Sequence, residues 1–420
     1  TDNLPHFRRK FQTVFGRAFY LKAAESWDPI TLGVMYHLTG DTSYAAAMDV
    51  MLKADAGKVG TGPKADGSRT PLEVNNVGGL DQAWCAAAFP RVPDEWKAGV
   101  LWLWNRSAGV TNLASVGKVF ERLEGGPNLA DAFGGYPLSP EGDSWSIKPV
   151  HPSRSLPLTW KAPKFGYYCF RSGWQGGDEF IAQVSTREKP VKGRNCANAG
   201  AFRIFGLGHP WVAGPAGPTG FRVQEPCVVL PEDEYNERAC GQLTHLETEE
   251  DGSGVMTIDL NDVYGEKRTG LRAMAFDYSG KSGAPALVVL VDKIVGGDER
   301  LWLWQLPRGK LDEVEIGKNS FTMSYRDASM KATFIAPNDV KIEATRDRVR
   351  AGKLGGPNGL FEGRLDRVKA RAPAGASFFV VITFQRKAPP EVDVKGKGLE
   401  AKITVGRRTV RFGDGKIELR

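Results

Sequence analysis

The distribution of apolar residues divides the chain into two parts. Up to about residue 135, apolar residues recur three to four positions apart, as at Ile30, Val34 and Leu38, which is the spacing of a helix. Pro93 precedes another such run and predicts a helix that ends at Arg106. Successive helices of this kind predict helical hairpins, stacked as in an α-solenoid or an (α/α) toroid.

Beyond about residue 165 the pattern is that of short strands. Apolar or alternating runs of five to eight residues are separated by Gly-rich turns, without helices between them. Such a series predicts a large antiparallel β-sandwich. The segments 403–412 and 416–419 flank a Gly-Asp-Gly turn and predict a closing hairpin. The predicted strands are 179–184, 201–205, 256–260, 286–291, 301–305, 331–335 and 377–384.

These patterns predict a multidomain α+β protein. An incomplete, toroid-like helical domain is expected over residues 1–135, and a Pro- and Ser-rich linker over 136–164. The sandwich is expected over 165–385, with a hairpin region over 386–420 that closes it. The length of 420 residues also favours more than one domain. No run of about 18 apolar residues is present, so no transmembrane helix is predicted.

Composition supports the strand-rich part and narrows the candidate chemistry. The 50 glycines and 26 prolines favour a chain with many turns. The five cysteines contain no CxxC pair and no two histidines stand four apart, so neither a disulfide framework nor a metal site is predicted.

Charge is concentrated near the C-terminus. Residues 341–420 hold 19 Lys and Arg against 9 Asp and Glu, within a chain of net charge +7. This basic region is consistent with an acidic partner, namely a polyanionic sugar, nucleic acid or lipid headgroups. A solvated basic sheet face explains the same charge, and both interpretations stay open.

Several stretches resemble the heparinase II/III-like family of polysaccharide lyases. Residues 166–174, GYYCFRSGW, resemble the first sandwich strand of that family. Residues 194–202, RNCANAGAF, and 208–211, GHPW, resemble the turn, strand and second turn that follow it. Residues 289–294 and 301–305 resemble two later strands, and 38–45 resemble the helical hairpin of toroid lyases more weakly.

The resemblance implies a toroid packed on a sandwich, with an acidic polysaccharide bound between them and cleaved by β-elimination at a uronic acid. Such a reaction needs a group that neutralises the uronate carboxylate, a base for the C5 proton and an acid for the departing O4. It requires no cofactor. The expected partner is an acidic polysaccharide, such as a glycosaminoglycan, rather than nucleic acid or a membrane. Because such polymers lie outside the cytoplasm, a periplasmic or extracellular location is expected.

The chain departs from the family pattern in the turn before the second strand. Cys196 stands where the family commonly has His, and Asn198 where it has Asp. The metal-holding His and Asp of some members therefore have no obvious counterparts. Whether the chain is an enzyme stays open, with a polysaccharide lyase favoured. The alternative is a catalytically degenerate protein of the same fold that binds glycans or serves as a scaffold.

The candidate site residues follow from this resemblance. Asn195 is expected to neutralise the carboxylate, Tyr136 to act as the base, and His209 to act as an alternative acid or base. Each also has a structural explanation, as a turn asparagine, a packed tyrosine, and a histidine that holds a backbone carbonyl. All are expected to converge in a cleft between the two modules. The candidate substrate-binding residues are Arg194, Arg222, Trp211 and His151.

Overall fold

The computed structural model describes most of the sandwich and parts of the region before it. Its described residues are 42–43, 46, 93–107, 147–162, 166–186, 188, 199–212, 240–264, 269–296, 299–307, 309–351 and 361–420. The chain divides into two compact units, residues 1–69 with 78–157 and residues 70–77 with 158–420.

In the first unit, the helix predicted from Pro93 is present as α5 (Asp94–Ser107). The carboxylates of Asp94 and Glu95 lie in its first turn, where the helix dipole favours negative charge. Residues 42, 43 and 46 are also helical. The other predicted helices before residue 93, and those after 107, lie outside the described residues, so the toroid stays a prediction.

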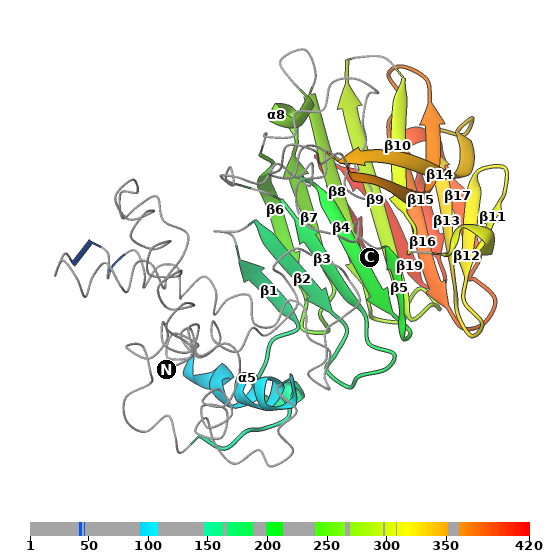
Figure 1. The fold of residues 1–420 in the computed structure, drawn as a ribbon. Helices are drawn as coiled ribbons and strands as arrows, with labels where there is room; N and C mark the ends of the chain where they lie inside the picture. The colour runs from blue at the N-terminus through cyan, green and yellow to red at the C-terminus, as the bar shows by residue number, and fades with distance from the viewer. Residues whose placement is uncertain are drawn as a thin grey trace. The chain divides into compact units, whose positions relative to one another are not determined.

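The second unit begins with a five-stranded antiparallel sheet in the order β1-β2-β3-β4-β5 (Figure 1). Strand β1 lies inside the range expected to be linker. Its Trp160 is buried and stands opposite Cys169, so a short strand forms where the sequence shows no periodicity. The strands are β1 (Thr159–Ala162), β2 (Tyr167–Arg171), β3 (Ile181–Ser185), β4 (Ala201–Gly206) and β5 (His209–Val212).

An eight-stranded sheet forms the next layer, in the order β11-β12-β13-β16-β9-β8-β7-β6. All its neighbours are antiparallel, as expected for a sandwich. Its strands are β6 (Gln242–Thr248), β7 (Gly254–Asp259), β8 (Thr269–Asp277), β9 (Ala286–Val295), β11 (Val314–Ile316), β12 (Ser320–Ser324), β13 (Ser329–Ala336) and β16 (Phe378–Gln385). A short helix, α8 (Asn261–Tyr264), follows β7.

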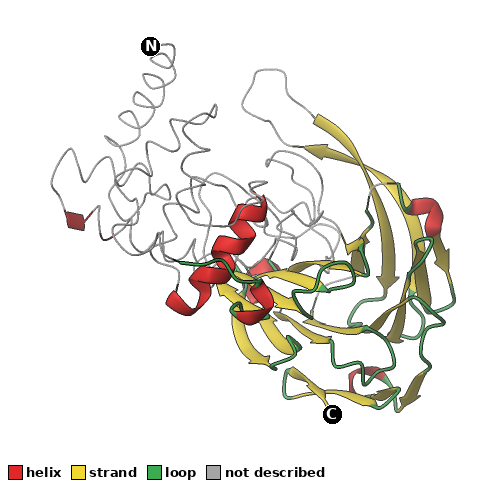
Figure 2. Cartoon of the chain, turned by 90° about the horizontal axis from the view of Figure 1, so that it is seen from below, coloured by secondary structure: helices red, strands yellow, loops and turns green. Residues whose placement is uncertain are grey.

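Two smaller antiparallel sheets complete this unit, and strands make up most of its described residues (Figure 2). One has the order β10-β15-β14 and the other the order β17-β18-β19-β20. Their strands are β10 (Arg300–Gln305), β14 (Lys341–Ala351), β15 (Phe361–Ala372), β17 (Val392–Lys395), β18 (Lys402–Val405), β19 (Arg408–Gly413) and β20 (Lys416–Leu419).

The central strands of the eight-stranded sheet are buried on both faces. One face of β16 contributes Phe378 and Val380 to a large core shared with β2, β4 and β10. Its other face contributes Phe379 and Val381 to a second core shared with β18 and β19. A strand between two cores needs apolar residues at every position, which explains the unbroken apolar runs in the sequence.

The C-terminal region contains the predicted hairpin as β19 and β20, but the first of its two predicted strands is divided. Gly406 has φ of 56°, and a Cβ there would lie 2.6 Å from the carbonyl oxygen of Ser282. The chain therefore turns at this point and divides the predicted strand 403–412 into β18 and β19. The result is a four-stranded sheet that covers the outer face of the eight-stranded sheet through the second core.

Candidate functional site

The turn expected to carry Asn195 is anchored at its C-terminal end by a buried ion pair. Arg272 on β8 stands opposite Asp292 on β9 and donates two hydrogen bonds to its carboxylate, at 2.5 and 3.0 Å. Its Nη1 donates a third, 2.7 Å long, to the carbonyl oxygen of Gly200, immediately before β4. Both charged side chains are buried, so the pair fixes the backbone where the turn enters the sheet.

The N-terminal end of the same turn is held by Glu188. Its carboxylate accepts a 2.6 Å hydrogen bond from the Tyr168 hydroxyl and one of 3.1 Å from the Thr186 hydroxyl. Burial, followed by the hydrogen bond to Glu188, raises the pKa of the Tyr168 phenol well above its usual value. The phenol therefore stays protonated near neutral pH and acts as a hydrogen-bond donor rather than a base.

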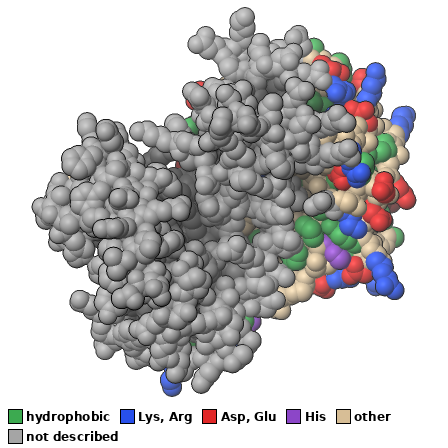
Figure 3. All heavy atoms as spheres, in the orientation of Figure 1, with side chains coloured by type: hydrophobic (Ala, Val, Ile, Leu, Met, Phe, Trp, Pro, Cys, Tyr) green, Lys and Arg blue, Asp and Glu red, His purple; other side chains and the backbone are tan. Residues whose placement is uncertain are grey.

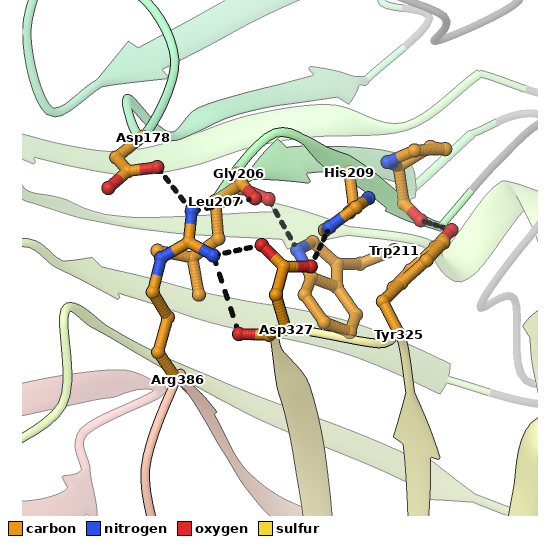
Figure 4. A network of polar contacts seen from close by, with 9 residues as sticks. Asp178, Gly206, Leu207, His209, Trp211, Tyr325, Asp327 and Arg386 are labelled. Atoms are coloured by element: carbon orange, nitrogen blue, oxygen red, sulfur yellow. Dashed lines mark hydrogen bonds and ion pairs between the residues drawn. The ribbon is translucent and has the colours of Figure 1, made fainter.

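His209 belongs to a polar network that joins β5 to the turn between β12 and β13 (Figure 4). Its Nε2 lies 2.7 Å from Oδ1 of Asp327, and its ring stacks on Tyr325 with centroids 4.0 Å apart. The Tyr325 hydroxyl donates to the carbonyl oxygen of Pro210, 2.6 Å away. The ammonium of Lys310 lies 4.2 Å from the centroid of the Tyr325 ring.

Arg386 extends this network to a second carboxylate. Its guanidinium contacts Asp327 and Asp178, and it donates to the carbonyl oxygen of Leu207 in the turn before His209 (Figure 4). The hydrogen bonds from His209 and Arg386 hold the pKa of Asp327 below its ordinary value. The network therefore contains an ionised carboxylate between two donors, which fixes the orientation of the His209 ring.

Trp211 and His151 occupy structural positions. Trp211 is fully buried, and its indole nitrogen donates to the carbonyl oxygen of Gly206 at 2.9 Å, so its ring is not available to stack on a sugar. This corrects the expectation of a substrate contact. In the first unit, Nδ1 of His151 accepts from the backbone of Ser153 and caps a short 3-10 helix, Pro152–Arg154. The edge of Trp102 contacts the His151 ring, with centroids 4.9 Å apart.

The other predicted site residues, Tyr136, Arg194, Asn195 and Arg222, lie outside the described residues, and their convergence stays a prediction. Among the residues that the structure describes, no three His, Cys, Asp or Glu side chains are grouped to hold a metal ion. None of the described helices is long and apolar enough to span a membrane.

Sequence reasoning assigned no role to Arg272 and Asp292. A signal was available, because Asp292 follows six consecutive apolar residues in its strand, and a carboxylate in such a place needs a partner. Its partner lies on the neighbouring strand, 20 positions away, and becomes visible only when the register is known.

The fold is similar to that of a solved polysaccharide lyase. A mutant of the heparan sulfate lyase HepC from Pedobacter heparinus matches this chain with a TM-score of 0.54 at 13% sequence identity. The match covers 96% of this chain and 59% of that one. The chain has the heparinase-like polysaccharide lyase fold.

Two further structures with this heparinase-like fold match at lower TM-scores. Heparinase III matches at 0.47 and 12% identity over 93% of this chain and 66% of its own. The chondroitin AC lyase of Streptomyces coelicolor A3 matches at 0.47 and 11% identity, over 91% and 56%. The chain thus spans about 59% of the length of HepC. No protein-family model matches the sequence, and neither does any curated protein.

Proposed function

We propose that this chain is a polysaccharide lyase that cleaves an acidic, uronic-acid-containing polysaccharide by β-elimination. The observation that carries the proposal is the fold shared with the heparan sulfate lyase HepC over 96% of the chain. The sequence resemblance at residues 166–174 and 194–202 supports it independently, since it concerns the strands and the turn beside the expected cleft.

The reaction makes three chemical demands. A base takes the C5 proton, and the electron pair of the C5–H bond forms a double bond between C4 and C5. The C4–O4 bond then breaks, its electron pair leaves with O4, and an acid protonates that oxygen. Because C5 is bonded to a carboxylate, negative charge spreads onto this group as the proton leaves. A donor aimed at the carboxylate lowers the barrier, and no cofactor is required.

The roles of the residues follow these demands. The Asn195 amide donates to the uronate carboxylate, Tyr136 removes the C5 proton, and His209 is the alternative acid or base. Arg194 and Arg222 orient the anionic chain through bidentate hydrogen bonds. The ion pair of Arg272 and Asp292 supports this assignment, because a rigid end to the turn limits the positions that Asn195 can take.

We further propose that residues 1–135 form a toroid-like helical domain, joined to the sandwich by a segment that begins at residue 136 and ends before β1. A chain that acts on such polymers works where they occur, so the proposed location is periplasmic or extracellular.

The test is a panel of polysaccharides with a site variant as the control. Heparin, heparan sulfate, chondroitin sulfate, hyaluronan, alginate and ulvan are each incubated with the purified chain, and unsaturated products are followed by ultraviolet absorbance. We expect at least one polymer to give such products and Asn195→Ala to abolish them. Binding of these polymers without any unsaturated product would instead favour a degenerate glycan-binding protein.

A further inference from the structure

The outward face of the C-terminal sheet carries a row of three cations. The inward side chains, such as those of Ile403 and Val410, are buried in the second core, so the alternate positions point outward. Lys395 on β17 stands opposite Lys402 on β18. Arg411 follows Val410, the register partner of Ile403, and therefore lies beside Lys402 on β19. Lys395, Lys402 and Arg411 together are called the basic rung.

Three other cations of this sheet form ion pairs with carboxylates. Arg408 binds Asp277, Lys416 lies 3.3 Å from Glu247, and Arg420 lies 2.7 Å from Glu418. Glu418 stands opposite Arg411 on β20, but its carboxylate is paired with Arg420. Within the part of the chain that the structure describes, no carboxylate forms an ion pair with a member of the basic rung. The described surface visible in Figure 3 is different, because basic and acidic side chains are interspersed there.

The stability of the fold does not explain the basic rung. A lysine on an edge strand prevents pairing with another sheet, and this accounts for Lys395 on β17. Lys402 and Arg411 lie on the two inner strands, where no edge needs protection. Lys395 and Lys402 stand directly opposite each other, and like charges in such a pair are destabilising, so this pair costs stability unless an anion lies over it.

We infer that the basic rung binds a polyanionic polysaccharide, which runs across the strands of the C-terminal sheet. Neighbouring strands are about 4.8 Å apart, so the three cations span roughly 10 Å and meet successive anionic groups of one chain. Thr404 and Thr409 stand opposite each other on the same face and supply hydroxyl groups to the polymer.

Two features favour a polysaccharide over a nucleic acid. The outward positions of β17–β20, all of them described, include no aromatic side chain on which bases would stack. The proposed substrate is itself an acidic polysaccharide, and the inference rests on the proposed function for this choice of polymer alone. The surface would hold the polymer independently of the site of cleavage.

The experiment compares two triple variants of the full chain. The test variant is Lys395→Gln with Lys402→Gln and Arg411→Gln. The control, Lys293→Gln with Lys318→Gln and Lys341→Gln, removes the same charge from exposed positions on three other elements. Heparin binding is measured by calorimetry at several salt concentrations, with circular dichroism to confirm folding, and a single-stranded oligonucleotide is the second probe.

For the test variant we expect at least about tenfold weaker heparin binding at low salt. The plot of log affinity against log salt should be shallower by about 2, because three contacts no longer release counterions. The control should bind nearly as the unmodified chain does. Equal weakening in both variants, or none in the test variant, would overturn the inference, and so would equally tight, rung-dependent binding of the oligonucleotide.

The readout is separate from that of the proposed function. If no polysaccharide yields unsaturated products but heparin binding still depends on the basic rung, the proposed lyase activity fails and the inference stands. If the chain cleaves a polysaccharide but heparin binding does not depend on the basic rung, the inference fails and the proposed lyase activity stands.

Discussion

The buried carboxylate of Asp292 is paired with the guanidinium of Arg272. This carboxylate lies on the face of β9 that points into the large core, and it accepts two hydrogen bonds from Arg272. The same guanidinium holds Gly200 at the entrance to β4. One buried side chain therefore links the stability of the sandwich to the position of the turn before β4.

Replacing Asp292 with Asn should destabilise the chain strongly. The change leaves the buried charge of Arg272 without a counter-ion, which typically costs about 3–5 kcal/mol of unfolding free energy. Urea unfolding at neutral pH measures the loss. Glu418→Gln, which removes the exposed partner of Arg420, is the control and should cost about 0–1 kcal/mol. Equal effects of the two changes would show that the pair of Arg272 and Asp292 contributes little.

At His209, the contacts predict that the neighbouring side chains orient the ring proposed as the alternative acid or base. The ring is held by Asp327 and Tyr325, so His209→Gln should keep the fold and reduce any lyase activity less than Asn195→Ala does. Asp327→Ala should imitate it, because it removes the carboxylate that orients the ring. Rates of unsaturated product formation decide the question. Complete loss of turnover in His209→Gln, with turnover retained in Asp327→Ala, would make His209 the acid or base itself.

The strands were predictable from the sequence wherever burial is uniform along them. The runs 286–291 and 377–384 match β9 and β16, because both faces of these strands are buried. Two other features were not predictable. Strand β1 depends on pairing with β2, and the division between β18 and β19 depends on the close approach of Gly406 to Ser282. Neither contact leaves a periodic signal.

The attachment of the C-terminal sheet depends on the pair of Asp277 and Arg408. Arg408 on β19 donates two hydrogen bonds of 2.8 Å to the carboxylate of Asp277 at the end of β8. Burial alone would raise the pKa of Asp277, but the hydrogen bonds from Arg408 and Ser279 outweigh it and lower the pKa below its usual value. The charged form is therefore favoured in the folded chain.

This shift gives stability a defined dependence on pH. A carboxyl group whose pKa is lower in the folded chain contributes stability. This contribution is fully present at pH values above the pKa of the same group in the unfolded chain, about 3.9. That contribution is lost as the pH falls through the folded value. Between pH 5 and pH 3, Asp277→Asn should therefore lose less stability than the unmodified chain, although it starts lower. Urea midpoints across this range test the prediction, and parallel curves for the two chains would contradict it.

At the scale of the whole molecule, the sandwich and its family resemblance were accessible from the sequence, whereas the chemical environment of the site was not. The resemblance of the segment 166–174 predicted the correct fold. This segment contains β2, whose side chains belong to the large core. His209 was expected to act as an alternative acid or base, or else to hold a backbone carbonyl, and its ring contacts a carboxylate 118 positions away. Partners so distant in sequence are set by the packing of layers, which no local pattern records.

The site residues that come only from the resemblance make a prediction for the whole chain. Asn195→Ala should lower turnover by about 100-fold or more, because it removes a donor to the developing charge. Tyr136→Phe should lower turnover similarly by removing the base, and polysaccharide binding should persist in both variants. Product formation and heparin binding are measured side by side. Unchanged turnover in both variants would exclude these two residues from the reaction.

The most direct test of the account is the origin of the oxygen atoms in the cleaved product. The chain is incubated with a polymer that it cleaves in water enriched in heavy oxygen, under conditions that prevent exchange at the reducing ends. The products are then weighed by mass spectrometry. Elimination adds no water, because the C4–O4 bond breaks and O4 stays with the departing fragment. It therefore predicts fragments that carry no heavy oxygen and whose new non-reducing end is lighter by one water than the product of hydrolysis. Fragments that gain one heavy oxygen at each cleavage would show hydrolysis and contradict the proposed function.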